Sequence, residues 1–172
     1  IAIIPAVVKV GFIVGGEYGE GLLLLNDEKG DWSNPIFITL SGGSIGWQLG
    51  AQSADFVLVF KTQRSVDSVL TDNLTLGVDV AAAAGPLGRR ARASTDMQLK
   101  AEIYSYSQSR GFFAGLSLDG ALIQIDDEAN SMLYGVEYIS PRDIQGRRDL
   151  KIPAEVRELK KTVSNTTQSL GR

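Results

Sequence analysis

The chain has 172 residues, of which 44% are apolar and 22% are charged, and this is the size and composition of one globular domain. It contains no histidine and no cysteine, which excludes Ser-His-Asp and Cys-His triads, disulfide bonds and zinc or iron–sulfur centres. The net charge of -3 argues against a wholly basic nucleic-acid-binding protein, so we expect no nucleic-acid partner. We expect no cofactor, and a metal site would need oxygen ligands alone.

Short apolar runs separated by glycine, proline or asparagine dominate the chain from residue 7 to residue 126, and they have the length and punctuation of β-strands. The run 46–60 is longer and indicates one long strand or a bent pair. The run 76–84 favours a strand because its valines alternate, although its four alanines leave a short helix open. The predicted strands are 10–14, 21–25, 36–40, 46–60, 76–84, 101–106, 111–118 and 121–125.

Two local signals predict a hairpin and an early helix. Asp119-Gly120 separates the runs 111–118 and 121–125, and this dipeptide is typical of a tight turn between antiparallel strands. Ser65 precedes a short helical segment over 66–70, and its hydroxyl is predicted to cap that helix.

The end of the chain has a helical pattern. Residues 128–134 are followed by Gly135, a common helix-ending residue, and Pro153 fits the first turn of a last helix. The sequence therefore predicts an α+β fold, a single compact domain dominated by antiparallel β-strands, with short helices that are mainly C-terminal. We place the domain at 1–140 and a C-terminal extension at 141–172, whose helix packs on or beside the domain.

The charges are unevenly distributed along the chain. Residues 89–110 carry five basic and two acidic side chains, and residues 142–172 carry eight and four, whereas the remainder is strongly acidic. A dipolar pattern of this kind can orient a protein toward an anionic surface.

The densest basic cluster is Arg89-Arg90-Ala91-Arg92, which follows the turn Gly85-Pro86-Leu87-Gly88 and should therefore reach the surface. Guanidinium groups grip phosphate oxygens in a forked geometry, so we interpret the cluster as a contact for phosphate or lipid headgroups. A solvated loop without a ligand would explain the same charges. The candidate lipid-binding residues are Arg89, Arg90, Arg92, Lys100, Arg110 and Lys9.

Two further motifs have simpler explanations than catalysis or metal binding. Gly42-Gly43-Ser44-Ile45-Gly46 has the G-x-S-x-G spacing of a hydrolase elbow, but no histidine is present to activate the serine, so we interpret it as a glycine-rich turn. Asp126-Asp127-Glu128 lacks the order of a calcium loop and fits a helix start, where acids are favourable. We predict no catalytic residues, no metal ligands and no enzyme activity.

Several distinctive segments occur in order along the chain. They are Ile3-Ile4-Pro5, Gly11-Phe12-Ile13-Val14-Gly15-Gly16, Gly19-Glu20-Gly21, Ser44-Ile45-Gly46-Trp47-Gln48-Leu49-Gly50-Ala51-Gln52, Gly85-Pro86-Leu87-Gly88-Arg89, Ile103-Tyr104-Ser105-Tyr106-Ser107, Gly111-Phe112-Phe113-Ala114-Gly115 and Tyr134-Gly135. With these segments the run 1–134 resembles the SYLF-domain family. Of the basic cluster, only Arg89 belongs to the shared Gly-Pro-x-Gly-Arg pattern.

The resemblance implies a lipid-binding module without enzyme activity. Eukaryotic members of the family bind phosphoinositides and some bind actin filaments, usually beside an SH3 or FYVE domain, whereas stand-alone members are bacterial and often exported. Because neither companion domain occurs in this sequence, we expect a stand-alone, bacterial-type member at the periplasmic or cell-envelope membrane surface. Actin binding is not expected for such a member.

The predicted function is non-enzymatic binding of anionic phospholipid headgroups, phosphoinositide-like or other acidic lipids, at a membrane surface through the arginine cluster. Each surface cation contributes about 1 kcal/mol near an anionic leaflet, so several must act together. Two different functions stay open. The chain could be an envelope structural or interaction protein whose last helix binds a partner through Arg157, Lys160 and Lys161. It could also be a carrier that holds an apolar ligand in a sheet-lined cavity.

Overall fold

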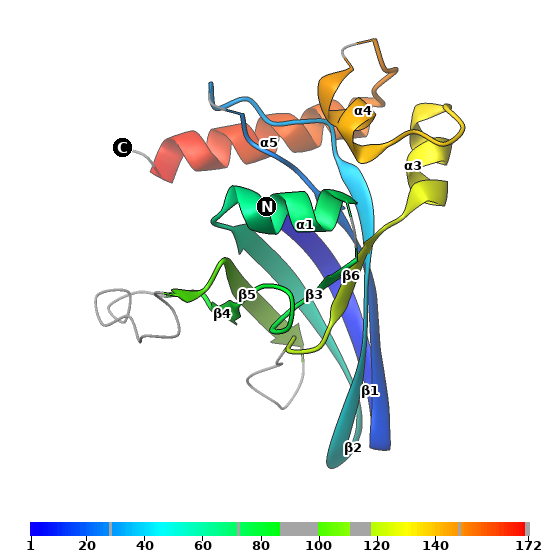
Figure 1. Cartoon of the computed structure of the whole chain (residues 1–172), viewed down its shortest axis with the longest axis vertical. Coiled ribbons are helices and arrows are strands. Elements are labelled where there is room, and N and C mark those ends of the chain that lie inside the picture. Colours follow the sequence, from blue (N-terminus) through cyan, green and yellow to red (C-terminus); the bar gives the residue numbers. More distant parts are fainter. Residues whose placement is uncertain (28, 72, 87–99, 111–117, 148, 171–172) are drawn as a thin grey trace. The chain divides into compact units, whose positions relative to one another are not determined.

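The computed structural model describes residues 1–27, 29–71, 73–86, 100–110, 118–147 and 149–170 (Figure 1). The chain divides into two compact units that alternate along the sequence. The sheet unit comprises residues 1–21 and 38–125, and the helical unit comprises residues 22–37 and 126–172. Each unit is described by itself.

One sheet organises the sheet unit. Its strands are β1 (Ala2–Leu23), β2 (Ile36–Phe60), β3 (Leu74–Thr75), β4 (Ala82–Ala84), β5 (Ile103–Arg110) and β6 (Leu122–Ile125). The strand order is β3-β6-β2-β5-β4, and β1 pairs with β2 outside this path. β2 pairs antiparallel with β5 and β6, and β3 pairs antiparallel with β6, whereas β4 runs parallel to β5. One helix, α1 (Gln63–Thr71), follows β2.

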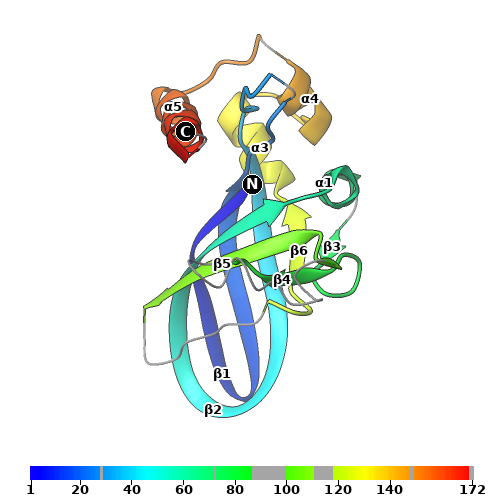
Figure 2. The ribbon, with the colours of Figure 1, turned by 90° about the vertical axis from the view of Figure 1, so that its left-hand side faces the viewer.

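β1 and β2 each turn back on themselves, and the β1 hairpin lies inside the β2 hairpin (Figure 2). Within β1, a methyl group on Gly19 would come within 2.7 Å of Val7, so the two arms of the strand are neighbours. β2 gives its first arm to β6 and its second arm to β5. The described sheet therefore has eight strand segments, because two of its six strands count twice. The bent pair expected for 46–60 is thus part of a longer bent strand.

Alternation along these strands builds the core of the sheet unit. Ala54, Phe56 and Leu58 are buried, whereas Asp55, Val57 and Val59 between them are not, which is the period of two that a strand imposes. The largest fully buried side chains of this unit are Ile4, Ile38, Leu40, Phe56, Leu58, Leu74, Leu76, Ile103 and Ile123. Val69 of α1 is also fully buried.

The helical unit contains α3 (Asp127–Tyr134), α4 (Pro141–Gly146) and α5 (Ala154–Leu170). Asp126 begins α3 by accepting a hydrogen bond from the Ala129 amide at 2.9 Å, and Gly135 ends it with φ +63. Ser140 caps α4 through the Asp143 amide at 3.1 Å. These boundaries explain why the acids at 126–128 start a helix, as expected.

Side chains connect the segment before β2 to these helices within the helical unit. Asn130 accepts from the Phe37 amide at 2.8 Å, and the Tyr134 hydroxyl donates to the Pro35 carbonyl at 2.6 Å. Asn34, which is buried, donates to the Ile144 carbonyl at 3.3 Å. The α+β fold with antiparallel strands and mainly C-terminal helices is confirmed, and the boundary at residue 140 stays a prediction.

Two local predictions are wrong for identifiable reasons. Thr62, not Ser65, caps α1, because the Thr62 hydroxyl accepts from the Ser65 amide at 3.2 Å and the helix starts at Gln63. In the run 76–84 only Ala82–Ala84 is a strand. Gly77, with φ +80, begins a turn, and the Asp79 carboxylate accepts from the Thr75 amide at 2.7 Å.

The hairpin expected around Asp119-Gly120 is described only in part. The turn itself forms, with Gly120 at φ +81 and the Ala121 amide donating to the Leu118 carbonyl at 2.9 Å. Leu122 and Ile123 of β6 pair with β2 on one side and with β3 on the other. Residues 111–117 lie outside the described residues.

Candidate functional site

The predicted lipid-binding residues do not form one described cluster. Arg89, Arg90 and Arg92 lie outside the described residues, and Arg110 is described only by its backbone, which pairs with Ser53 at the end of β5. Lys100 is exposed just before β5. Lys9 lies apart from Lys100. The Lys9 ammonium is 3.6 Å from the carboxylate of the buried residue Glu17, and only 26% of the Lys9 side chain is exposed. Lys9 is therefore occupied by an internal ion pair.

A group of charged side chains that we call the basic corner surrounds the start of β5. It consists of Lys61, Arg64, Lys100 and the carboxylate of Glu102. The three cations are exposed, and Glu102 is half-buried. The Lys61 amide donates to the Glu102 carbonyl at 2.8 Å, which brings the end of β2 and the start of α1 to the start of β5. Three cations and one carboxylate therefore lie on these neighbouring segments, and Arg64 contacts the carboxylate.

Lys61 is held on an aromatic ring. Its ammonium lies 4.2 Å from the centre of the Tyr104 ring, and it donates to the Tyr104 hydroxyl at 3.1 Å and to the Ala101 carbonyl at 2.9 Å. A cation over a tyrosine face is stabilised by the ring quadrupole. The contacts fix the position of this charge while the side chain stays exposed to solvent.

Glu102 organises the opposite side of the basic corner. Its carboxylate accepts from the Thr62 hydroxyl at 2.9 Å and from Arg64 at 3.4 Å. The Arg64 side chain is 73% exposed, whereas that of Glu102 is 19% exposed. An exposed ion pair of this kind contributes little to stability, so the guanidinium group can exchange Glu102 for another anion at small cost.

Two motifs of the sequence meet beside the basic corner. Gly85 lies against the ring of Tyr106, and its amide donates to the Ser105 carbonyl at 2.8 Å. The described chain leaves β4 at Gly85-Pro86 and resumes at Lys100. Lys100 precedes Ala101, whose carbonyl accepts a hydrogen bond from Lys61. The three arginines belong to residues 87–99 between these two points, which lie outside the described residues.

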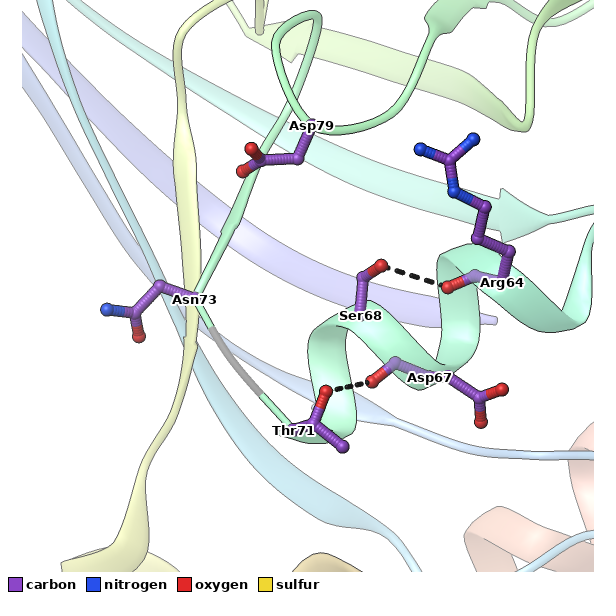
Figure 3. A pocket seen from close by; sticks show the side chains of 6 residues that line it. All are labelled: Arg64, Asp67, Ser68, Thr71, Asn73 and Asp79. Carbon is purple, nitrogen blue, oxygen red and sulfur yellow. Dashed lines mark hydrogen bonds between the residues drawn. The ribbon is translucent and has the colours of Figure 1, made fainter.

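A cavity of about 600 Å³ lies along α1 and shares Arg64 with the basic corner. It is lined by Arg64, Asp67, Ser68, Thr71, Asn73 and Asp79. Figure 3 shows that the charged side chains point in different directions, and that the hydroxyls of Ser68 and Thr71 donate to carbonyls of the helix itself. The lining is polar and its groups do not converge, so this cavity fits neither an apolar cargo nor a bound ion.

Partner binding through the last helix finds little support in the described part of the chain. On α5, Lys160 donates to Asn34 at 3.2 Å and Arg157 to the Ile152 carbonyl at 2.6 Å, so two of the three cations expected to bind a partner have internal contacts. Among the described residues, no three acidic side chains gather as metal ligands would. Within the same residues, no helix has the length and apolar character needed to cross a membrane.

Sequence reasoning missed Lys61 and Arg64. Both follow directly after the buried strand segment that ends at Phe60, and such a cation at a strand end can reach the next strand of the sheet. The available signal was the alternation of Tyr104 and Tyr106, which places both rings on one face of β5. Without the pairing of Val59 with Tyr104, no spacing rule connects Lys61 to that face.

A comparison with family models gives one match over most of the chain. The family is Ysc84, described as Las17-binding protein actin regulator, and its model matches residues 41–166. The match includes most of β2, the basic corner and most of the three C-terminal helices. No solved structure matches the chain.

Curated relatives match most of this chain but only part of their own length. SH3 domain-containing protein PJ696.02 of Schizosaccharomyces pombe is 34% identical over 148 residues, which are 84% of this chain and 34% of that protein. LAS seventeen-binding protein 3 of Saccharomyces cerevisiae is 36% identical over 147 residues, or 84% of this chain and 32% of that protein. SH3 domain-containing YSC84-like protein 1 of Bos taurus is 32% identical over 166 residues, or 96% and 48%. The chain spans a third to a half of these relatives.

Proposed function

Because the chain belongs to the Ysc84 family of SYLF domains, we propose that it is a non-catalytic module that binds anionic phospholipid headgroups at a membrane surface through the basic corner and the arginines at 89–92. The expected resemblance to SYLF domains is confirmed by the family match. The three relatives are eukaryotic, so a bacterial, envelope location has no support from them and stays a prediction.

The observation that carries the proposal is the position of three exposed cations around Ala101 and Glu102. Lys61, Arg64 and Lys100 lie where the stretch with Arg89, Arg90 and Arg92 rejoins the sheet. If each cation contributes about 1 kcal/mol near an anionic leaflet, the three described ones change membrane partitioning by roughly two orders of magnitude.

The basic corner has the chemistry that a phosphate group requires. Arg64 offers a forked guanidinium whose present partner, Glu102, is held in an exposed and therefore weak pair. Lys61 offers a charge fixed on the Tyr104 ring, so little side-chain entropy is lost when a phosphate binds. Each of these two groups can contact a headgroup phosphate.

Vesicle co-sedimentation tests this proposal. We expect binding to phosphatidylcholine vesicles that contain phosphatidylserine or a phosphoinositide, and none to phosphatidylcholine alone. Binding should weaken strongly between about 0.1 M and about 1 M salt, because the Debye length falls from about 10 Å to about 3 Å. Equal binding to neutral and anionic vesicles would contradict the proposal.

Matched variants locate the surface. Replacing Lys61 with Gln, Arg64 with Ala and Lys100 with Ala should reduce binding to anionic vesicles by about a hundredfold, and so should Arg89→Ala with Arg90→Ala and Arg92→Ala. The control removes three exposed cations of the helical unit, Lys29, Arg142 and Lys151, and should change binding little. Equal losses in all three variants would mean that net charge, not this site, governs binding.

A second candidate function follows from the family description, which names an actin regulator. The sequence alone did not favour actin for this chain, and the family match gives a reason to test it. Co-sedimentation with actin filaments, using the same three variants, separates the two functions. Filament binding without vesicle binding would replace the lipid proposal.

We also propose that the module has no enzyme activity. Without histidine and cysteine, a serine nucleophile would need another activating base. Turnover of an ester or phosphoester that is lost on Ser44→Ala would overturn this.

A further inference from the structure

The carboxylate of Glu102 is held in place within the basic corner. The Glu102 amide donates to the Ala81 carbonyl at 2.8 Å, and the Glu102 carbonyl accepts from the Lys61 amide at 2.8 Å, so the backbone is bound on both sides. The Glu102 side chain is only 19% exposed, and its carboxylate accepts from the Thr62 hydroxyl at 2.9 Å. A negative charge is therefore fixed among the cations of the basic corner.

Thr62 connects this carboxylate to the start of α1. The Thr62 hydroxyl donates to Glu102 and accepts from the Ser65 amide at 3.2 Å, which satisfies a free N–H of the first helical turn. If the carboxylate moved away, the hydroxyl that caps the helix would lose its acceptor. The cap of α1 thus favours the present position of the carboxylate, with or without an anion nearby.

The guanidinium of Arg64 is the member of the ion pair that can move. The Arg64 side chain is 73% exposed, and its Nη1 atom lies 3.4 Å from the Glu102 carboxylate, which is long for a charged hydrogen bond. A long, solvated arginine side chain can swing away from a carboxylate that cannot follow it. An anion that approaches Arg64 therefore has to compete with Glu102 for the guanidinium.

The size of this competition separates two kinds of anion. An exposed ion pair changes an equilibrium by a factor of up to about five. A single dissolved phosphate that takes Arg64 from Glu102 has to overcome this factor alone. An anionic leaflet presents many phosphates at once, and each exposed cation contributes a factor of about five near it. Lys61 and Lys100 can therefore offset the lost ion pair at a leaflet.

We propose that Glu102 is an internal competitor for Arg64 and makes the basic corner selective for anionic surfaces over dissolved phosphate. This inference rests on the proposed lipid-binding function and adds a residue that sets its specificity. Glu102 acts through Arg64, so it is a positioning residue. It keeps the guanidinium occupied until several anions are present together.

The variant Glu102→Gln tests the proposal, because its amide oxygen still accepts from Thr62 while the negative charge is removed. In co-sedimentation with vesicles of phosphatidylcholine and phosphatidylserine, it should bind two- to fivefold more tightly than the unaltered chain. Inorganic phosphate is then added as a competitor, against sodium chloride of equal ionic strength. Phosphate should release the variant from vesicles at a concentration at least twofold lower than it releases the unaltered chain.

Asp67→Asn is the matched control, because it makes the same change of charge on α1. The Asp67 carboxylate accepts from Gln63 at 3.0 Å, and Figure 3 shows the Asp67 side chain directed away from that of Arg64. This variant should leave the response to phosphate unchanged. In an Arg64→Ala background, Glu102→Gln should also leave that response unchanged, because no guanidinium remains to be released.

The outcomes separate this inference from the proposed function. Equal phosphate responses of Glu102→Gln and Asp67→Asn would overturn the inference and leave lipid binding in place, and so would an undiminished effect of Glu102→Gln in the Arg64→Ala background. A lowered melting temperature of Glu102→Gln with unchanged binding would reduce Glu102 to a structural role and overturn the inference too. If none of these proteins binds anionic vesicles, the proposed function fails and the inference fails with it.

Discussion

The ring of Tyr106 lies against the backbone of Gly85, where an added methyl group would collide with the ring carbon Cζ. This contact joins the turn that precedes the arginine stretch to the second tyrosine of β5. The ring occupies the space of a side chain, and only glycine leaves room for it.

We therefore expect Gly85→Ala to destabilise the protein by roughly 1–3 kcal/mol, because the ring or the backbone must move. For a chain of this length, that loss lowers the melting temperature by about 2–4 °C per kcal/mol. Gly43→Ala is the control, since a methyl group there meets nothing within 4 Å. Equal melting temperatures of the two variants would show that the contact does not constrain the fold.

The contact between Lys61 and Tyr104 should be measurable as a coupling energy. Lys61→Met keeps the length of the side chain but removes its charge, and we expect a loss of about 0.5–1 kcal/mol, as for other exposed cation–π pairs. A double-mutant cycle with Tyr104→Leu, followed by urea unfolding, isolates the pair. Additive effects of the two substitutions would mean that the ammonium gains nothing from the ring.

Tyr134 should titrate at unusually high pH. Burial raises the pKa of its hydroxyl well above the usual value near 10, and the hydroxyl donates to the Pro35 carbonyl. The neutral form is favoured in the folded state, so this stabilisation is complete below about pH 10 and is lost as the pH rises through the higher folded pKa.

Absorbance at the phenolate band should show an ionisation step at unusually high pH. Tyr134→Phe should remove the late step, whereas Tyr138→Phe, at a position 86% exposed, should leave it in place. A late step that survives in Tyr134→Phe would assign it to another residue.

Ala6 has a backbone conformation that favours glycine, with φ +52. Relief of a left-handed strain of roughly 1–2 kcal/mol outweighs or balances the entropic cost of glycine, so Ala6→Gly should be neutral or stabilise by about 1 kcal/mol. Ala51→Gly, on β2 without this conformation, should instead cost roughly 0.5–1 kcal/mol. Chemical denaturation of the two variants measures the contrast, and equal losses would contradict the assigned strain.

Local patterns predicted the helices and strands of this fold better than they predicted which strands pair with each other. Apolar runs located the first arm of β2, the start of β5 and β6, and Asp126 and Gly135 located the ends of α3. The nested hairpins were not predictable, because a period of two is the same on either side of a bend and says nothing about which arm becomes a neighbour. The Asp-Gly turn was recognised, yet β6 pairs with β2 and β3, which are distant in sequence.

The candidate site was predicted in part. Lys100 was recognised as an exposed cation next to β5, whereas Lys9 was not free, because Glu17 lies beside it across the β1 hairpin. Lys61 and Arg64 reach the site through the pairing of β2 with β5, a contact between segments some 40 residues apart. Charge clusters along the sequence therefore indicate the kind of surface but do not identify every residue that forms it.

The position of β1 inside β2 also limits how the chain can be shortened. A fragment cut at the limits of the family match, residues 41–166, would lose β1 together with the start of β2. The remaining second arm of β2 would then present an open edge where β1 had been, and unpaired edges of this kind recruit other chains. Such a fragment would be prone to aggregation even though it retains the basic corner, so binding studies require the first 40 residues.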